Sequence, residues 1–513
     1  MTEENVFLQL QNGSDIRGVA TAGYRDEKVT LTAQRAHTIA RAFAFWLAQY
    51  ARKECEQLTI SVGMDSRLSG PSLKRAIVEG LKSSGVSVLS FGLCTTPAMF
   101  MSTVLPETKA DGAIMITASH LPYNRNGIKF FTRDGGLEKA DISAILAQSG
   151  QGFGEAARVR GHARRMDFLS VYARYLCAKI REGIQDASCY ERPLTGLKIC
   201  VDAGNGAGGF FVTHVLNALG ANTGGSQFLQ PDGHFPNHIP NPEDARAIAF
   251  VKEAVTQNAC DLGIIFDTDV DRCAVVDVTG REINKSRFIA LISAIVLREN
   301  PGASIVTDSV TSDELTNFIN SHLGAVHRRF KRGYKNVIDE AVRLNQTGEV
   351  CPLAIETSGH GALRENYFLD DGAYMVAKIL VEMARLKKEG KTITGLLEAY
   401  TDPKESVEFR LQIAARDFEG YGELVLRELL SCAKVKNWAI APNSHEGVRV
   451  CFPEGEGGGW LLLRMSLHDP IMPLNIESSQ VGGAAIIAEK LAAFLKPFEE
   501  IRITALSEWL EKQ

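Results

Sequence analysis

Residues 113–131 read Ala-Ile-Met-Ile-Thr-Ala-Ser-His-Leu-Pro-Tyr-Asn-Arg-Asn-Gly-Ile-Lys-Phe-Phe. The apolar run at 113–116 predicts a strand buried on both faces, and the Pro, Asn and Gly residues after it predict a loop. A second strand is expected at 128–131, with Lys129 directed outward. Ser119, His120 and Lys129 would then lie where a parallel strand ends, which is where open α/β sheets bind ligands. Taken alone, Ser119 and His120 also fit a simple capped turn.

A strand–helix–strand unit recurs three times along the chain. Its first strands are expected at 58–65, 197–202 and 303–308, and each of them ends at an Asp. Helix-like stretches at 71–83, 209–219 and 314–322 follow, and each leads into a Gly-containing turn. This is the βαβ pattern of a parallel sheet, so we expect three related α/β domains in tandem.

Composition changes mark the domain boundaries. Residues 150–165 are rich in Gly and basic residues and predict a surface loop and linker, with an amphipathic helix at 166–184 after it. Beyond residue 405 the repeat is lost, and an alternating strand at 407–413 opens a smaller α+β domain. The expected domains are therefore residues 1–160, 165–298, 299–402 and 403–513.

The overall composition excludes several classes of protein. The chain has 513 residues, of which 45% are hydrophobic and 23% charged, and a formal net charge of −5. Such a chain has no general attraction for nucleic acid or acidic membranes. Its ten cysteines show no Cys-x-x-Cys spacing, which predicts reduced thiols rather than a disulfide framework or a zinc site. No signal sequence or long apolar run is present, so we expect a cytoplasmic protein. We further expect a monomer or dimer without nucleic-acid or membrane partners.

A second candidate site follows the apolar run at 262–266. It carries Asp267, Asp269 and Asp271 at alternate positions, which in an extended chain lie on one side. Three carboxylates this close suit a hard divalent cation, Mg²⁺ above all. An EF-hand is excluded, because a loop starting at Asp267 would need Gly where Arg272 stands. The alternative, a solvated acidic turn, fits poorly with the fully apolar strand before it.

Weaker signals lie further along the chain. Glu356, Ser358 and His360 follow another apolar strand, and such side chains suit hydrogen bonds to sugar hydroxyls, although a capped turn is the default explanation. Basic residues around Lys331 could hold a phosphate or simply form a solvated face. A strand ending near Arg464 also offers donors for an anion, and these are Arg464, Ser466 and His468.

The ordered set of motifs resembles the α-D-phosphohexomutase superfamily, the phosphoglucomutase/phosphomannomutase enzymes, over nearly the whole chain. Each motif is only moderately specific, but their order and spacing together are a strong signal. The motifs are Asp15-Ile-Arg-Gly18, Gly63-Met-Asp-Ser-Arg-Leu-Ser-Gly70, Thr117-Ala-Ser-His120, Asn126-Gly-Ile-Lys129, the Asp-x-Asp-x-Asp-Arg of 267–272, Glu356-x-Ser-Gly-His360 and Arg464-x-Ser466.

The resemblance implies an architecture and a set of roles. Three related α/β domains with mixed sheets and a smaller α+β C-terminal domain would surround a central cleft. Ser119 would be the phosphoserine, and its oxygen would complete a Mg²⁺ site with Asp267, Asp269 and Asp271. The transferring phosphoryl group would be surrounded by Arg17, His120, Lys129 and Arg272. The sugar would be bound by Lys331, Glu356, Ser358 and His360. The second phosphate would be bound by Arg464, Ser466 and His468.

The implied reaction interconverts hexose 1-phosphate and hexose 6-phosphate of glucose, mannose or both. Phosphoserine would form a hexose 1,6-bisphosphate intermediate, which would also activate the enzyme. The chemistry fits these residues, because phosphoryl transfer needs mainly charge compensation and alignment. The chain departs from the family at Leu121, where Asn is usual, at Thr268 and Val270, where Gly is usual, and at 467–470, where Gly-Thr-Glu-Pro is usual.

Three alternatives remain open at this level. A specialised family member could release glucose 1,6-bisphosphate with another sugar bisphosphate as phosphoryl donor. The altered loops could instead belong to a non-catalytic sugar-phosphate sensor. Finally, the short motif at Asp267 and Asp269 also resembles the nucleophile strand of haloacid-dehalogenase-like phosphatases, although Asp271 argues against it.

Overall fold

A computed structural model describes residues 3–24, 26–153, 157, 159–442, 444–466 and 469–513. The chain divides into two compact units, residues 1–284 with 358–394 and residues 285–357 with 395–513. Among the described residues, no helix is both long enough and apolar enough to cross a membrane.

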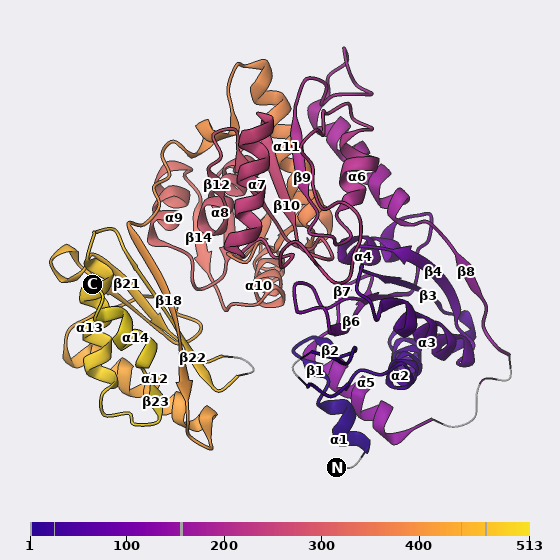
Figure 1. Ribbon diagram of the computed structural model, residues 1–513, viewed down its shortest axis with the longest axis horizontal. Coiled ribbons are helices and arrows are strands. Elements are labelled where there is room, and N and C mark those ends of the chain that lie inside the picture. The colour runs from indigo at the N-terminus through magenta and orange to yellow at the C-terminus, as the bar shows by residue number, and fades with distance from the viewer. Residues whose placement is uncertain (1–2, 25, 154–156, 158, 443, 467–468) are drawn as a thin grey trace. The chain divides into compact units, whose positions relative to one another are not determined.

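The first unit begins with an eight-stranded mixed sheet (Figure 1). Strands β3, β4, β5 and β8 run parallel to one another, β6 is antiparallel to β5, and β2 is antiparallel to β6. The sheet order is β1-β2-β6-β5-β3-β4-β8, with β7 paired to β6. The bounds are β1 Gln11–Asn12, β2 Asp15–Val19, β3 Thr59–Met64, β4 Ser87–Leu93, β5 Gly112–Ile116, β6 Arg125–Thr132, β7 Gly135–Gly136 and β8 Ala163–Arg165.

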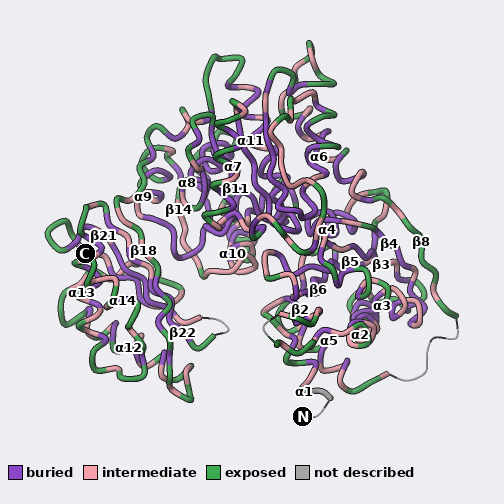
Figure 2. Tube along the Cα trace, viewed as in Figure 1, coloured by how far each residue is buried: buried purple, intermediate pink, exposed green. Residues whose placement is uncertain are grey.

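Helices cover both faces of this sheet. A Cβ at Gly112 of β5 would meet Leu47 and Phe43, whereas a Cβ at Gly63 of β3 would meet Met99. Because these two positions point to opposite faces, α2 lies on one face and α4 on the other. Figure 2 shows the resulting burial along the central strands. The helices are α1 Glu3–Leu8, α2 Ala33–Ala51, η1 Cys55–Gln57, α3 Gly70–Ser83, α4 Thr96–Val104 and α5 Lys139–Gln151.

The second sheet of this unit has the order β12-β11-β10-β9. β9 and β10 are parallel, and the other pairs are antiparallel. Helix α7 packs on the sheet through a buried cluster that contains Val251, Val255 and Ile265. The strands are β9 Ile199–Asp202, β10 Leu262–Phe266, β11 Cys273–Asp277 and β12 Glu282–Ile283. The other elements are α6 Leu169–Ile184, η2 Phe211–Leu216, α7 Ala245–Asn258, the hairpin β16 Gly361–Leu363 and β17 Leu369–Asp370, η4 Arg364–Asn366 and α11 Gly372–Lys388.

The second unit opens with a βαβ module in which β13 pairs parallel with β14 and β15. Its elements are α8 Lys285–Leu297, β13 Ser304–Thr307, α9 Asp313–Asn317, η3 Phe318–His322, β14 Val326–Arg329, α10 Tyr334–Gln346 and β15 Leu353–Ile355. The short helix η5, Ile393–Leu397, leads into the last part of the chain.

The last part is an antiparallel sheet of order β19-β20-β21-β22-β18-β23. Its helices bury a core that includes Leu411, Leu461 and Leu474. The elements are β18 Glu405–Ile413, α12 Phe418–Val435, β19 Ala439–Ile440, β20 Val448–Phe452, η6 Glu454–Glu456, β21 Gly459–Leu463, β22 Ile471–Ser478, α13 Gly483–Leu495, β23 Ile501–Arg502 and α14 Thr504–Leu510.

Most elements expected from the sequence are present, but the expectations for residues 150–165 and for Lys129 are wrong. The end of the predicted loop at 150–165 forms β8, because its backbone pairs parallel with the exposed edge of β4 although its side chains show no strand pattern. Lys129 is buried, not directed outward, because its ammonium group lies among carboxylates. The cysteines are free thiols, as expected, and seven of the ten are buried.

Candidate active site

Ser119 lies in the loop that leaves the buried strand β5. Its backbone has a φ of +49°, a left-handed conformation that is strained for a residue with a side chain. The Ser119 amide donates to Thr117 Oγ1 at 3.0 Å, which stabilises the turn. Strain at a hydroxyl beside charged groups is typical of a functional position.

Arg67 holds this loop in place. Its guanidinium donates to the carbonyl oxygens of Pro122 and Arg125 at 2.8 and 2.9 Å, and to those of Ser119 and Leu121 at 2.5 Å each. The side chain is fully buried, and Asp65 balances its charge at 3.3 Å. The planar fork of Arg can satisfy several carbonyls at once, which an ammonium group cannot.

The three aspartates lie in the tight connection between β10 and β11. One oxygen from each of Asp267, Asp269 and Asp271 lies within 4.8 Å of the others, and all three residues are buried. The clustering expected from the sequence is confirmed, but the reason given for it is wrong. The connection turns instead of staying extended, and Val270 has a φ of +66°.

The turn keeps this geometry although it carries Val270, a β-branched residue, at the left-handed position. Gly372, at the start of α11, donates its amide to the Val270 carbonyl at 3.1 Å. A Cβ at Gly372 would come within 3.0 Å of the Val270 oxygen and within 2.7 Å of Arg272. Close packing by α11 therefore stabilises a left-handed conformation that a β-branched residue disfavours.

The electrostatics of the aspartate cluster favour a cation. Burial, together with the charges of Asp271 and Asp269, raises the pKa of Asp267 well above its usual value. Although burial acts in the same direction on Asp271, Lys129 and Arg272 lower the pKa of that carboxyl. Lys129 Nζ lies 2.6 Å from Asp271 and 3.4 Å from Asp269. The cluster thus carries more negative charge than Lys129 can balance alone.

Ser119 is directly connected to this cluster. Its hydroxyl donates to Asp267 Oδ2 at 2.7 Å and accepts from Arg272 Nη2 at 3.0 Å. Arg272 Nη2 also donates to His120 Nδ1 at 2.6 Å. Burial and the neighbouring cations Arg272 and Arg17 lower the pKa of His120 to about 3, so its imidazole is neutral.

Three further predicted side chains lie in this unit. Arg17 Nη1 donates to the Ala118 carbonyl at 3.3 Å, one residue before Ser119. His360 Nε2 lies 3.8 Å from Asp271 Oδ1, and its Nδ1 lies 2.9 Å from Ser358 Oγ. The first unit therefore brings together Arg17, Ser119, His120, Lys129, Asp267, Asp269, Asp271, Arg272, Ser358 and His360.

The other predicted side chains belong to the second unit. Glu356 accepts a hydrogen bond from the Gly333 amide at 2.6 Å, and burial and Asp308 raise its pKa to about 7. Lys331 is exposed in the loop before α10. Arg464 is buried after β21, and the Ser466 amide donates to Ile471 at 3.0 Å. His468 lies outside the described residues.

Sequence reasoning passed over several residues that the structure places at these sites. Thr96, at the start of α4, donates its hydroxyl to Asp269 Oδ2 at 2.5 Å and its amide to the Asp269 carbonyl at 2.9 Å. Glu446 accepts from the Arg332 amide at 3.1 Å and lies 4.0 Å from Arg464. The Thr-Pro pair at 96–97, a common helix start, was the only signal for Thr96.

The aspartate cluster fits a divalent cation. Asp269 Oδ1 and Asp271 Oδ1 are buried and accept no hydrogen bond from any described residue. Unsatisfied carboxylate oxygens are costly in a protein interior, and they are the donors that hard cations prefer. The three aspartates can therefore hold a metal ion, with the Ser119 hydroxyl next to it.

Family models match most of the chain. The models for phosphoglucomutase/phosphomannomutase α/β/α domains I, II and III match residues 9–152, 177–280 and 284–402. The chain is 31% identical to a phosphoglucomutase of Neisseria gonorrhoeae, over 94% of this chain and 95% of that protein. It is also 31% identical to a phosphomannomutase/phosphoglucomutase of Pseudomonas syringae, over 90% of each.

Solved structures agree with the sequence matches. A phosphoglucomutase/phosphomannomutase family protein from Burkholderia thailandensis is similar, with a TM-score of 0.78, 28% identity and coverage of 97% of this chain and 98% of that one. An N-acetylphosphoglucosamine mutase of Aspergillus fumigatus, solved with GlcNAc-6P and magnesium, has a TM-score of 0.54 and 14% identity. It covers 90% of this chain and 99% of that one, and at this identity it supports the fold alone.

The chain therefore belongs to the phosphoglucomutase/phosphomannomutase family. The predicted family, enzyme class and fold of three α/β/α domains with a further sheet domain are confirmed. The phosphatase alternative is excluded, because the match to this family extends over most of the chain. The residue boundaries of the four domains and the roles of individual side chains stay predictions.

Proposed function

We propose that the protein interconverts the 1- and 6-phosphates of a hexose, glucose or mannose, through a phosphorylated Ser119. The contact between the Ser119 hydroxyl and Asp267, at 2.7 Å with Arg272 alongside, is the main support. It puts a nucleophilic oxygen on a carboxylate cluster that suits Mg²⁺, next to a guanidinium. Relatives named phosphoglucomutase and phosphomannomutase/phosphoglucomutase support the substrate class.

In the proposed cycle, phospho-Ser119 gives its phosphoryl group to a free hydroxyl of the hexose monophosphate, forming a hexose 1,6-bisphosphate. Ser119 then takes the other phosphate, which leaves the isomeric monophosphate. The bisphosphate would also restore phosphate to an enzyme that has lost it, and so activate it. Mg²⁺ bound by Asp267, Asp269 and Asp271 would balance the charge of the phosphoryl oxygens.

The side chains around Ser119 would act by charge and alignment. Arg272 donates to both the nucleophile and His120, so it would orient both and stabilise negative charge on the transferring group. Lys129 would supply a second positive charge from β6. Because Arg272 donates to Nδ1, the neutral imidazole of His120 holds its proton on Nε2, where it could donate to a phosphoryl oxygen.

The remaining predicted side chains would bind the rest of the substrate. We propose that Arg464 and Ser466 bind the phosphate that does not react, with His468 as a further donor. Glu356, Ser358 and His360 would accept or donate hydrogen bonds to the sugar hydroxyls, and Lys331 would contact the substrate from its exposed loop. These roles use the donor and acceptor types of the side chains.

The phosphoenzyme can be tested by mass. Intact mass and peptide mapping, before and after incubation with glucose 1,6-bisphosphate or with hexose monophosphates, should show one phosphate on Ser119 that is gained and lost. Ser119→Ala should abolish this phosphorylation. Ser69→Ala is the matched control, because Ser69 is also buried and its hydroxyl is bonded only to Asn126 among the interactions described. No phosphate on Ser119 with any of these ligands would refute the proposal. Comparing glucose and mannose esters measures the preference between them.

A further inference from the structure

One cavity of the first unit is lined by no residue of the Ser119 loop or the aspartate cluster. Its volume is about 1010 Å³, at the upper limit of the range of small-molecule sites. It is bounded by α3, the end of β4, β8 and the chain that leads into α6. The described lining residues are Met64, Pro71, Lys74, Arg75, Val78, Glu79, Lys82, Ser90, Phe91, Gly92, Leu93, Ala163, Arg165, Met166, Asp167 and Leu169.

The wall formed by β8 is firmly attached to the sheet. β8 pairs parallel with β4, and the Met166 amide donates to the Ser90 carbonyl at 3.2 Å. The Val88 amide donates to the His162 carbonyl at 2.8 Å on the other side of the pairing. The cavity is therefore built by backbone hydrogen bonds between distant parts of the sequence.

The cavity carries a net positive charge in a chain that is acidic overall. Four cationic and two carboxylate side chains line it, whereas the formal net charge of the chain is −5. The carboxylates are already engaged, because Glu79 pairs with Lys82 at 2.9 Å and with Arg160, and Asp167 accepts two hydrogen bonds from Ser170. Lys74, Arg75 and Arg165 have no carboxylate partner among the described residues.

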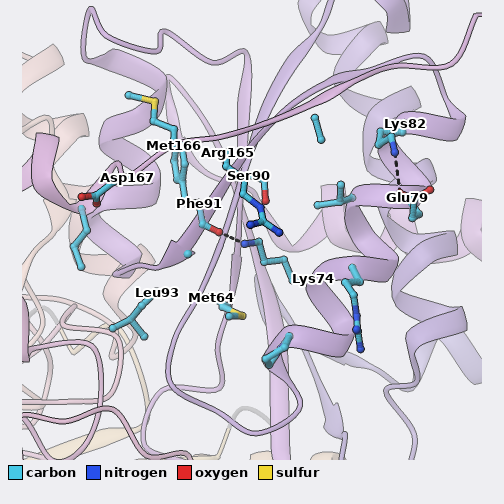
Figure 3. A pocket seen from close by; sticks show the side chains of 16 residues that line it. Met64, Lys74, Glu79, Lys82, Ser90, Phe91, Leu93, Arg165, Met166 and Asp167 are labelled. Atoms are coloured by element: carbon cyan, nitrogen blue, oxygen red, sulfur yellow. Dashed lines mark hydrogen bonds and ion pairs between the residues drawn. The ribbon is translucent and has the colours of Figure 1, made fainter.

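Lys74 is the central cation. It is half-buried on α3, and its ammonium group donates to the Phe91 carbonyl (Figure 3). An ammonium group has three donors, so two are left for a ligand. Burial and the nearby positive charge of Arg165 lower the pKa of Lys74. Two cations held together without a carboxylate repel one another, and an anion between them would remove that repulsion.

The rest of the lining is apolar. Met64, Val78, Leu93, Met166 and Leu169 line the same cavity as the cations. Methionine side chains adapt to ligands of different shape. A site with apolar walls and a few charged groups suits organic ligands rather than inorganic ions alone. Guanidinium groups at Arg75 and Arg165 match the geometry of phosphate oxygens.

We propose that this cavity binds a small organic phosphate through Lys74, Arg75 and Arg165, with its organic part against the apolar wall. The site is separate from the groups assigned to phosphoryl transfer, so the proposal does not depend on the function proposed above. Two lining residues, Met64 and Leu93, are close in sequence to residues that contact the Ser119 loop or the aspartate cluster. Met64 precedes the Asp65 that pairs with Arg67, and Leu93 leads to Thr96 at the aspartate cluster.

Methionine methyl NMR on the full-length chain would test the proposal. Phenyl phosphate is the probe, since it carries one phosphate and one apolar ring, and inorganic phosphate and phenol are the comparison ligands. Signals of Met64 and Met166 are assigned with Met64→Leu and Met166→Leu. We expect saturable shifts of both signals by phenyl phosphate, weaker binding of inorganic phosphate and none of phenol.

Variants separate this site from others. Lys74→Gln and Arg165→Gln should each weaken binding about tenfold, which corresponds to about 1.4 kcal/mol. Arg164→Gln is the matched control, because Arg164 is an exposed neighbour on β8 that does not line the cavity. Met465, beside Arg464, reports binding in the second unit and should be insensitive to Lys74→Gln.

The outcomes are distinct. Shifts of Met64 and Met166 that never saturate, or that Lys74→Gln and Arg165→Gln leave unchanged, would overturn the proposal. Unaltered signals of the buried Met99 and Met115 establish that each variant is folded. A saturable shift of Met465 alone would support phosphate binding in the second unit and reject the cavity lined by Lys74. The proposed function and the proposed cavity site therefore fail independently.

Discussion

Replacing Thr96 by Val tests whether α4 positions the aspartate cluster. Thr96 Oγ1 donates to Asp269 Oδ2 at 2.5 Å, and both residues are buried. Valine has nearly the same shape but no hydroxyl. The other donor to this oxygen, Lys129, lies 3.4 Å away, so the carboxylate would lose its shortest hydrogen bond.

The expected loss follows from the charge of the acceptor. A hydrogen bond to a charged group contributes about 1.5–3 kcal/mol, so we expect Thr96→Val to lower the stability of the metal-free protein by about 2 kcal/mol. Partners that orient a metal ligand typically change affinity by about 10–100-fold, so binding of Mg²⁺ should weaken by at least about tenfold. Urea unfolding and calorimetric titration with Mg²⁺ measure the two effects.

Thr103→Val is the matched control. Thr103 is a buried residue of the same helix, and its hydroxyl donates to the neutral Phe100 carbonyl at 2.8 Å. We expect this variant to bind Mg²⁺ as the parent does and to lose only about 1 kcal/mol. If Thr96→Val and Thr103→Val have the same Mg²⁺ affinity and stability, the hydroxyl of Thr96 does not position Asp269 and the reasoning is wrong.

Three further changes test other parts of the first unit. Arg67→Lys should expose the loop at 117–125 to proteolysis, because an ammonium group has three donors for the four carbonyls that Arg67 bonds. At least one hydrogen bond is then lost, at about 1.5–3 kcal/mol; unchanged cleavage rates would contradict this role of Arg67. Gly372→Ala should lower kcat at least about tenfold, because the added methyl group would displace Arg272 and such overpacking costs about 1–3 kcal/mol. The control Gly455→Ala, where the methyl group enters open space, should leave kcat unchanged. His238 is buried against Asp202 at 3.0 Å; burial lowers its pKa, but the hydrogen bond and charge of Asp202 prevail and raise it above the usual value. The stabilisation of the fold by protonated His238 is complete below the unfolded pKa of about 6.5 and is lost as the pH rises through the pKa of the folded state. His238→Gln should therefore destabilise the protein more at acid than at alkaline pH. Equal losses of stability at both pH values in urea unfolding would refute this prediction.

Strand and helix positions were largely predictable from local patterns. The apolar run before Ser119 and the run before Asp267 are strands β5 and β10, because consecutive apolar residues in short runs are typical of strands buried on both faces. The helix expected at 71–83 is α3, with Pro71 in its first turn. The strand β8 was missed, because three exposed residues paired only through their backbone carry no side-chain pattern.

The amino-acid sequence by itself determined the chemistry available to this protein. It supplies a serine at the end of a strand, aspartates at three alternate positions, and several Lys and Arg side chains within recognisable motifs. Only the tertiary structure decided which of these groups meet. It buried Lys129 against Asp271, placed Ser119 on Asp267 across 148 positions of sequence, and made Thr96 and Arg67 part of the site. The physical reason is that charge compensation and hydrogen bonding in the interior depend on distances through space, which local periodicity does not encode.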